Sequence, residues 1–154
     1  MLKYMPSIPQ DSFADPRVRL TIDDGAEFVK QARKRGKRYD LVIVDSPDPI
    51  GPARSLFQTS FYLDIAKILN PEGIVIRQTG SSVLQPDEMP SNYRQMLEIF
   101  PEVQGFITAV PTYIGGYFTF VAASPKKGIF REAIRTLERR LGDFPVETLR
   151  WYSA

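Results

Sequence analysis

The sequence predicts an α/β domain whose doubly wound, mostly parallel sheet ends in a C-terminal antiparallel hairpin. Strand-like segments alternate with segments of helical periodicity, which favours parallel strands joined by right-handed crossovers. The run YDLVIVD (Tyr39 to Asp45) is continuously apolar, as in a strand buried on both faces of a parallel sheet. The pair Gly115-Gly116 separates the last two strand-like segments and can supply the positive φ angles of a tight turn. The length of 154 residues suits a single domain over 1–154.

The N-terminal elements are expected to be an irregular segment, a strand and a helix. RVRLTI, residues 17–22, alternates enough to be a strand. Asp24 and Glu27 then form the capping-box pattern of a helix N-terminus, and Gly36 is placed to end that helix.

The remaining elements follow from periodicity and from Pro and Gly residues at their boundaries. They are a helix over 60–70, a strand over 73–80, a helix over 87–99, strands over 105–113 and 117–124, and an amphipathic helix over 129–141. In doubly wound sheets ligands bind outside the carboxyl ends of the strands. Asp24, Asp45 and Gln78 each lie at such an end, so we expect them to converge on one edge.

The composition excludes several chemistries. The chain has no cysteine and no histidine, which excludes disulfides, zinc–thiolate sites, catalytic thiols and His-based catalysis. No apolar run approaches the roughly 20 residues that span a bilayer, and MLKYMPSIPQ lacks the apolar core of a signal peptide. We therefore expect a cytoplasmic protein without membrane contact.

The net charge of +2 gives no general affinity for nucleic acid. The one basic run, KQARKRGKR (Lys30 to Arg38), suits the last turn of a helix, where cations interact favourably with the helix dipole. Aromatic residues are not interleaved with its charges, as a base-stacking surface would need. We expect no nucleic-acid partner.

Four segments together resemble the spermidine synthases and related polyamine aminopropyltransferases. DSPDPIGPA (Asp45 to Ala53) resembles their D-[ST]-x-D-P-x-G-P-A signature, and PTYIGG (Pro111 to Gly116) resembles their P-T-Y-x-[GS]-G. DPRVRLTIDDGAEFV (Asp15 to Val29) is similar to the segment that carries their adenine-contacting Asp-Gly. RQTGS (Arg77 to Ser81) is similar to their strand end x-Q-x-[GE]-S, and all four matches keep the family's order and spacing.

The resemblance implies a partial Rossmann-like, class I methyltransferase-like fold with strand order 3-2-1-4-5-7-6. It implies an enzyme that transfers the aminopropyl group of decarboxylated S-adenosylmethionine to putrescine or a related amine, in polyamine biosynthesis. Methylthioadenosine is the second product, and no metal is needed.

The resemblance also assigns roles to individual residues. Asp45 is the expected general base, and the amine pocket is expected to contain Asp48, Gln78 and Tyr113. On the nucleoside side, Asp24 would accept from the adenine amino group and Gly25 would allow close backbone approach. Ser46, Pro52 and Ala53 would line the same side.

This chemistry gives a reason for two carboxylates, Asp45 and Asp48, close to prolines in the sequence. An amine must lose a proton before it can attack the methylene beside a sulfonium, and its pKa lies near ~10.4. One carboxylate can accept that proton while the other holds cationic charge, and Pro47 and Pro49 restrict the backbone around both. An aspartate with a pKa near ~3.9 is a weak base for this task. Either its surroundings raise the pKa of Asp45, or the proton leaves late, and the sequence leaves both open.

Simpler interpretations stand beside these roles. Asp24 can be only a helix N-cap, Asp45 a solvated residue at a strand end, and Tyr113 a hairpin residue. Asp48-Pro49 can be turn chemistry, and Asp45 with Asp48 can form a magnesium site, although we expect no metal.

The family pattern has a front half without a counterpart here: an N-terminal β-domain, a Gly-rich donor loop and an acidic strand end that grips the ribose. We therefore expect a truncated catalytic domain in which the 17–22 and 39–45 strands have unpaired edges and stripped apolar faces. Three outcomes are open: the two strands pair directly, a second subunit fills the gap, or a complementing chain supplies the other half. We expect a homo-oligomer or a complementing chain. The alternative function is a non-catalytic homologue that binds polyamine or nucleoside, or acts as a subunit of a larger assembly.

Overall fold

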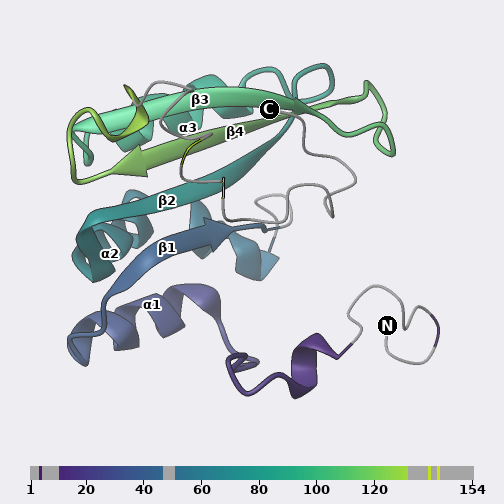
Figure 1. The fold of residues 1–154 in the computed structure, drawn as a ribbon. Coiled ribbons are helices and arrows are strands. Elements are labelled where there is room, and N and C mark those ends of the chain that lie inside the picture. The colour runs from purple at the N-terminus through teal and green to yellow at the C-terminus, as the bar shows by residue number, and fades with distance from the viewer. Residues whose placement is uncertain (1–3, 5–10, 47–50, 132–138, 140–141, 143–154) are drawn as a thin grey trace.

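The fold is described by a computed structural model of the 154-residue chain. It describes residue 4 and residues 11–46, 51–131, 139 and 142. In Figure 1 the other residues form the thin grey trace.

The described elements alternate between helices and strands. In chain order they are η1 (Ser12–Ala14), α1 (Gly25–Lys34), β1 (Tyr39–Val44), η2 (Gly51–Phe57), α2 (Thr59–Ile68), β2 (Leu69–Ser81), α3 (Glu88–Leu97), β3 (Glu102–Ala109), β4 (Tyr117–Ser124) and η3 (Ile129–Arg131). Within this part of the chain, none of the helices combines the length and apolar character that crossing a membrane requires.

The four strands form one sheet in the order β1-β2-β4-β3 (Figure 1). β1 and β2 are parallel, and Val44 lies opposite Arg77. β4 is antiparallel to both of its neighbours, β2 and β3. Three of the four strands therefore run in the same direction. This confirms the expected α/β class, and the order equals the last four positions of the expected 3-2-1-4-5-7-6.

The core lies between one face of the sheet and helices α1, α2 and α3. Alternation in β2 places Val75 and Thr79 on this face, and both are fully buried. From α2, the buried side chains include Phe61, Ile65 and Ile68, which lie on one side of the helix. Neighbouring positions in this set are three or four residues apart along the helix, so one side of α2 packs against the sheet.

α1 forms as predicted at its N-terminus. The carboxylate of Asp24 accepts hydrogen bonds from the backbone N–H groups of Ala26 and Glu27, at 2.8 and 3.1 Å. The reciprocal half of a capping box is not made, because the backbone N–H of Asp24 donates to the side chain of Asp23 instead. At the other end Gly36 has φ 65°, the left-handed conformation that ends many helices.

The predicted strand over 17–22 is wrong. These residues are irregular and exposed, with Ile22 at 92% of its possible accessible surface. A strand is stabilised by the ladder of a neighbour, and no described residue pairs with this segment. It therefore does not pair directly with β1, which removes the first of the three outcomes considered above.

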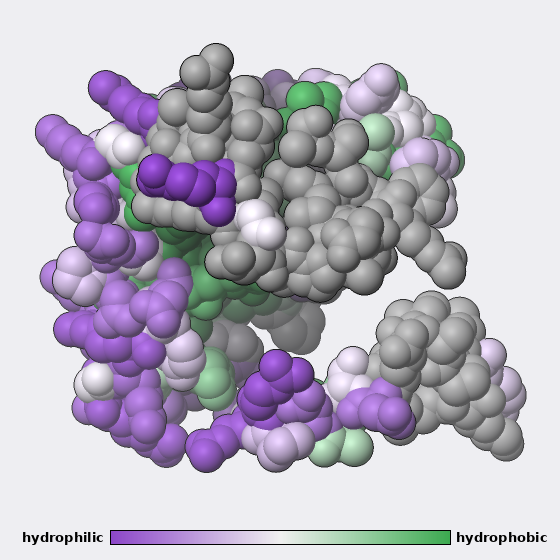
Figure 2. Space-filling model, in the orientation of Figure 1, coloured by the Kyte–Doolittle hydropathy of each residue, from purple (hydrophilic) through white to green (hydrophobic). Residues whose placement is uncertain are grey.

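For the 39–45 strand, burial on both faces is wrong, and the unpaired edge and exposed apolar face expected without the front half are found among the described residues. β1 has one hydrogen-bonded neighbour, β2, and lies at the edge of the described sheet. Leu41 is 50% exposed and Ile43 67% exposed on the face away from α2. Figure 2 shows hydrophobic residues in the hollow over the sheet, in contrast to the hydrophilic surface beside it. Apolarity alone does not report whether the covering layer is present.

The hairpin between β3 and β4 confirms the role expected for the glycine pair. Gly115 has φ 89° and Gly116 φ 69°, angles that side-chain-bearing residues rarely adopt. β3 ends at Ala109, earlier than the predicted residue 113, so Tyr113 belongs to the connecting loop. Most of the helix predicted over 129–141 lies outside the described residues.

Candidate functional site

A polar cleft of about 430 Å³ opens at the carboxyl ends of β1 and β2. Four residues predicted from the sequence line it together: Asp45, Ser46, Gln78 and Tyr113. Six further residues complete its wall: Phe57, Arg77, Gly80, Gln85, Glu88 and Phe118. The expected convergence on one edge is therefore confirmed for Asp45 and Gln78, and it is wrong for Asp24, which does not line this cleft.

Strand register brings these two side chains together. Val44 pairs with Arg77 in the parallel ladder, so the next residues, Asp45 and Gln78, leave the two strands side by side on the same face. Asp45 is exposed and Gln78 is partly buried. An exposed carboxylate beside a partly buried amide can receive a cationic or hydrogen-bonding ligand from solvent.

Tyr113 reaches the cleft from the β3–β4 loop. Its backbone N–H donates to the carbonyl of Val110 at 3.1 Å, which closes a turn. Its ring packs on Phe118 with the ring centroids 4.4 Å apart, and it stays 55% exposed. This packing holds the ring at the rim of the cleft with its hydroxyl available to a ligand.

Arg77 lies in the wall of the cleft and was not predicted as a site residue. It is 1% exposed, and its Nη1 donates to the carbonyl of Leu56 at 2.7 Å and to the hydroxyl of Tyr62. The guanidinium lies over the ring of Phe57, 3.8 Å from its centroid. The one sequence signal for this residue was a charged side chain inside the apolar strand GIVIRQTG.

Burial changes the acidity of Tyr62, on the core side of Arg77. Loss of solvent around the hydroxyl raises the pKa of Tyr62 to about 12, although the Arg77 charge acts in the opposite direction. The hydroxyl also donates to Asn92 at 3.2 Å. Tyr62 is therefore neutral at physiological pH and serves as a hydrogen-bonding bridge.

α3 contributes a second carboxylate, Glu88, to the cleft. Gln85 connects it to the end of β2: its side-chain carbonyl accepts from the backbone N–H of Ser81 at 3.2 Å, and its amide donates to Glu88 at 3.3 Å. The described lining thus holds the carboxylates Asp45 and Glu88 and the single guanidinium of Arg77, an excess of negative charge that suits a cationic ligand. Sequence reasoning missed Glu88 because its place in the wall depends on how α3 packs.

A second cleft, of about 350 Å³ and mainly apolar lining, runs along β1 beside α1. Gly25, Asp45 and Ser46 all line it, so Asp45 and Ser46 form the wall shared by the two clefts. The rest of the second wall is apolar and aromatic, including Phe28 and Leu56. A flat, weakly polar group bound here would lie next to a ligand held by Asp45.

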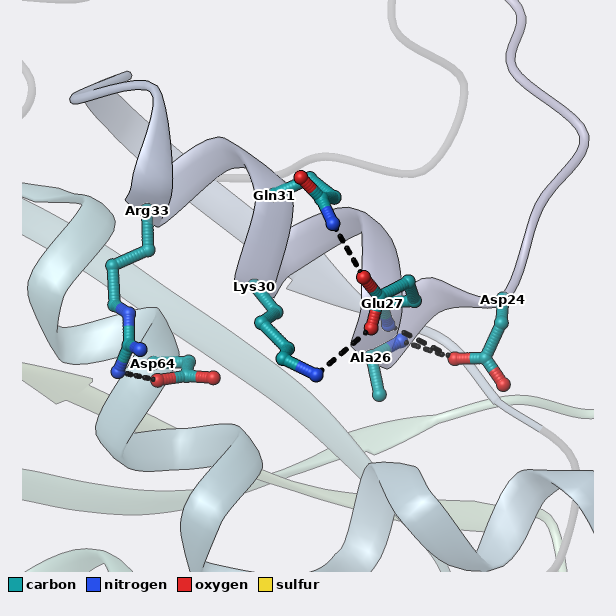
Figure 3. Close-up of polar contacts among 7 residues, drawn as sticks. All are labelled: Asp24, Ala26, Glu27, Lys30, Gln31, Arg33 and Asp64. Carbon is teal, nitrogen blue, oxygen red and sulfur yellow. Dashed lines mark hydrogen bonds and ion pairs between the residues drawn. The ribbon is translucent and has the colours of Figure 1, made fainter.

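Asp24 does not line either of these clefts. Figure 3 shows its carboxylate turned to the first turn of α1, where it caps Ala26 and Glu27. It borders a separate hollow with Lys30 and Asp64 among its lining residues. The N-cap interpretation of Asp24 is confirmed, and contact with a nucleoside stays a prediction.

Glu27, one turn along, is held by its own helix. Hydrogen bonds from Gln31, at 2.5 Å, and from Lys30, at 3.2 Å, lower the pKa of its carboxyl group. Its carboxylate therefore stabilises α1 rather than serving as a base for a ligand (Figure 3).

The other predicted site residues have side chains outside the described part of the chain or lie outside the two clefts. Asp48 and the side chain of Pro52 lie outside the described residues. Ala53 lies in η2, partly buried, and is absent from the lining of the two clefts that Asp45 and Ser46 share. Among the residues that the structure describes, no three potential metal ligands of the His, Cys, Asp and Glu types cluster together.

The sheet order and the cleft at the strand ends define a ligand-binding domain of the Rossmann-like, methyltransferase-like class. The sequence comparison specifies the family. The pattern of the "Spermine/spermidine synthase domain" matches residues 1–133, and the chain belongs to this family.

Curated relatives carry the corresponding name. The chain is 39% identical to the "Polyamine aminopropyltransferase" of Hamiltonella defensa over 98% of its own length and 51% of the relative. It is 38% identical to "Polyamine aminopropyltransferase 1" of Pseudomonas aeruginosa over 99% of its length and 52% of the relative. The chain thus spans about half the length of the curated relatives it matches.

Solved structures agree with the fold. A spermidine synthase crystallised with the transition-state analogue AdoDATO matches with a TM-score of 0.77 at 27% identity, covering 90% of this chain and 46% of that structure. The spermidine synthase of Thermotoga maritima matches with a TM-score of 0.69 at 26% identity, covering 84% and 41%.

Proposed function

We propose that this chain carries the amine-binding part of a polyamine aminopropyltransferase. The proposed reaction transfers the aminopropyl group of decarboxylated S-adenosylmethionine to putrescine or a related amine. The observation that carries the proposal is the meeting of Asp45, Gln78 and Tyr113, from three separate parts of the chain, in one polar cleft. That cleft shares a wall with an apolar one suited to a nucleoside.

The reaction makes one bond and breaks one. The amine nitrogen forms a bond to the methylene beside the sulfonium, and the carbon–sulfur bond breaks with its electron pair going to sulfur. The sulfonium becomes the neutral thioether of methylthioadenosine, and the amine loses a proton. Holding nitrogen, carbon and sulfur in line supplies a large part of such an acceleration.

We assign the proton to Asp45, because it is the carboxylate on the wall common to both clefts. A nucleophile between the two ligands would lie beside it. Gln78 and Tyr113 would bind the amine chain by hydrogen bonds, with Asp48 as the proposed second carboxylate.

Donor binding is assigned to the β1–α1 side. Gly25 and Ser46 line the apolar cleft there. For Asp24, Pro52 and Ala53 the donor-side role rests on the family resemblance alone. A structure similar to this chain holds AdoDATO, and this supports a nucleoside-bearing co-substrate for this chain as well.

The edge of β1 that has no described partner is relevant to how the donor is bound. Relatives are about twice as long, and β1 exposes Leu41 and Ile43 beside an edge without a described partner. We propose that a homo-oligomer or a complementing chain covers this edge and completes donor binding. A non-catalytic subunit that binds polyamine is the second candidate, because the amine cleft forms without any such partner.

The test measures methylthioadenosine release with putrescine as acceptor, for the chain alone and mixed with the N-terminal part of the Pseudomonas relative. We expect Asp45→Asn to lower the rate by about 100-fold or more, the range for loss of a general base. Asp40→Asn is the matched control, since Asp40 lies in the same strand but hydrogen-bonds to Asn70 outside the cleft. Equal rates for wild type and Asp45→Asn would contradict the role of Asp45. Putrescine binding without turnover, both by the chain alone and in the mixture, would favour the non-catalytic candidate.

A further inference from the structure

Arg77 contacts residues on two sides of the polar cleft, one just after β1 and the others in η2. On the β1 side, its Nη2 donates to the hydroxyl of Ser46 at 3.5 Å, the long limit of a hydrogen bond. On the η2 side, its Nη1 donates to the carbonyl of Leu56 at 2.7 Å. Asp45, next to Ser46, and Phe57 of η2 both line the polar cleft, so one side chain of β2 contacts two of its walls.

The guanidinium is also fixed by stacking and by the core. It lies 3.8 Å from the ring centroid of Phe57 in η2, and Nη1 also reaches the hydroxyl of Tyr62 in α2. A planar guanidinium presents its donors in a rigid fork, so it can hold several acceptors at set relative positions. Arg77 therefore links β1, η2 and α2 to the central strand of the site.

The burial of the Arg77 charge does not by itself stabilise the fold. Arg77 is 1% exposed, and within the part of the chain that the structure describes its Nε has no hydrogen-bond partner and its other donors contact neutral groups. A buried charge held mainly by neutral acceptors contributes less to stability than a well-packed apolar side chain of similar size. A role at the site accounts for an arginine at this position better than a role in the core.

We propose that Arg77 is a positioning residue, which sets the relative placement of Ser46 and η2 and thereby the position of Asp45, next to Ser46, in the wall of the polar cleft. This inference rests on the proposed function where it concerns amine binding. The positioning itself is independent of the ligand and can be measured without one.

The first test is amide hydrogen exchange of the unliganded chain. Arg77→Met should increase exchange in η2, residues 51–57, by about tenfold or more, since a hydrogen bond from a charged group is lost. Exchange in β3 and β4 should stay unchanged. Tyr62→Phe is the matched control, because it removes the core-side contact of Arg77 and leaves Ser46 and Leu56 in place. Equal effects of the two substitutions in η2 would overturn the proposal.

The second test is the dissociation constant of putrescine, whose sign separates positioning from charge. Removing a cation from an amine-binding cleft by itself strengthens binding of a dication. We expect Arg77→Met to weaken binding by about tenfold instead, because Asp45, next to Ser46, loses its position in the cleft wall. Tighter binding by Arg77→Met would show that Arg77 acts only as a nearby charge, and unchanged binding with lower stability would show a purely structural role. Either result overturns the proposal.

Arg77→Lys is a second variant for the case in which Arg77→Met does not fold. It keeps the charge but not the fork, so we expect increased exchange in η2 and weaker putrescine binding in a folded protein. Wild-type behaviour of Arg77→Lys in both tests would overturn the proposal. If the wild-type chain does not bind putrescine, the proposed function fails, and the exchange comparison still decides whether Arg77 positions η2.

Discussion

β1 and β2 are neighbouring parallel strands with similar apolar sequences, but they differ in strand pairing and in burial. β2 has a hydrogen-bonded neighbour on each side, and Val75 within it is fully buried. β1 has a described neighbour on one side only, and it leaves Leu41 and Ile43 largely exposed. Both strands nevertheless deliver a side chain to the same cleft, Gln78 from β2 and Asp45 from β1.

The comparison shows that the cleft depends on the position of the carboxyl ends of β1 and β2. The two strands need not be buried to the same extent. Register with β2 is sufficient to place Asp45, because the parallel ladder extends to the pairing of Val44 with Arg77. β1 is stabilised from one side, and the remaining apolar surface is available to a further layer. Substitutions in the two strands can test this description.

The largest expected effect separates the interiors of the two strands. Val75→Asp buries an unpaired carboxylate and should lower the free energy of unfolding by about 4 kcal/mol or more, enough to unfold many domains. Ile43→Asp places the same group on a face that is exposed in the single chain, and in the monomer it should change the free energy of unfolding by less than about 1 kcal/mol. Urea unfolding followed by circular dichroism measures both. A large loss of stability in Ile43→Asp would show that another chain covers this face in solution.

A second effect tests the buried side of β2 through Tyr62. Its pKa of about 12 in the folded state exceeds the usual value near 10, so the unfolded chain releases this proton first. Stability is therefore fully present below about pH 10 and falls as the pH rises toward 12. The loss should reach about 1.4 kcal/mol by pH 11. Tyr62→Phe should remove this part of the alkaline dependence, measured as the difference between the two proteins in urea unfolding at pH 8 and pH 11.

The sequence predicts well those features that depend on local pattern or on strand order. α2 and β2, the N-cap at Asp24 and the positive φ angles of Gly115 and Gly116 all follow from residue type and spacing. The meeting of Asp45 and Gln78 follows from parallel strand ends.

Features that depend on partners distant in the sequence were not predictable. Alternation suggested a strand over 17–22, but a strand also needs a neighbour, and the sequence does not report whether one is present. Arg77 and Glu88 enter the cleft wall through packing of η2 and α3 against β2, which periodicity does not specify. The separation of Asp24 from the cleft likewise depends on the placement of α1.

A smaller effect concerns the β1 side, where Asp24 caps α1. Asp24→Ala removes the acceptor of two backbone N–H groups and should lower the free energy of unfolding by about 1 kcal/mol. Asp23→Ala is the control, since Asp23 accepts one hydrogen bond from the backbone of Asp24 and caps no helical N–H group. Unfolding in urea gives both values. A loss of AdoDATO affinity in Asp24→Ala with unchanged stability would make nucleoside contact, rather than capping, its main role.

The smallest expected effect concerns the attachment of α1 to α2. Arg33 of α1 and Asp64 of α2 form an ion pair at 2.5 Å, with the arginine side chain 46% exposed and the aspartate 17% exposed (Figure 3). Solvent screens such a pair, so a double-mutant cycle with alanine at both positions should give a coupling of about 0.5 kcal/mol. The coupling should fall further in 1 M salt, where the screening length is about 3 Å. A coupling above about 2 kcal/mol that resists salt would mean that the pair is desolvated. α1 would then be fixed to the core as firmly as the elements around β2, and the contrast between the two strands would be confined to the exposed face of β1.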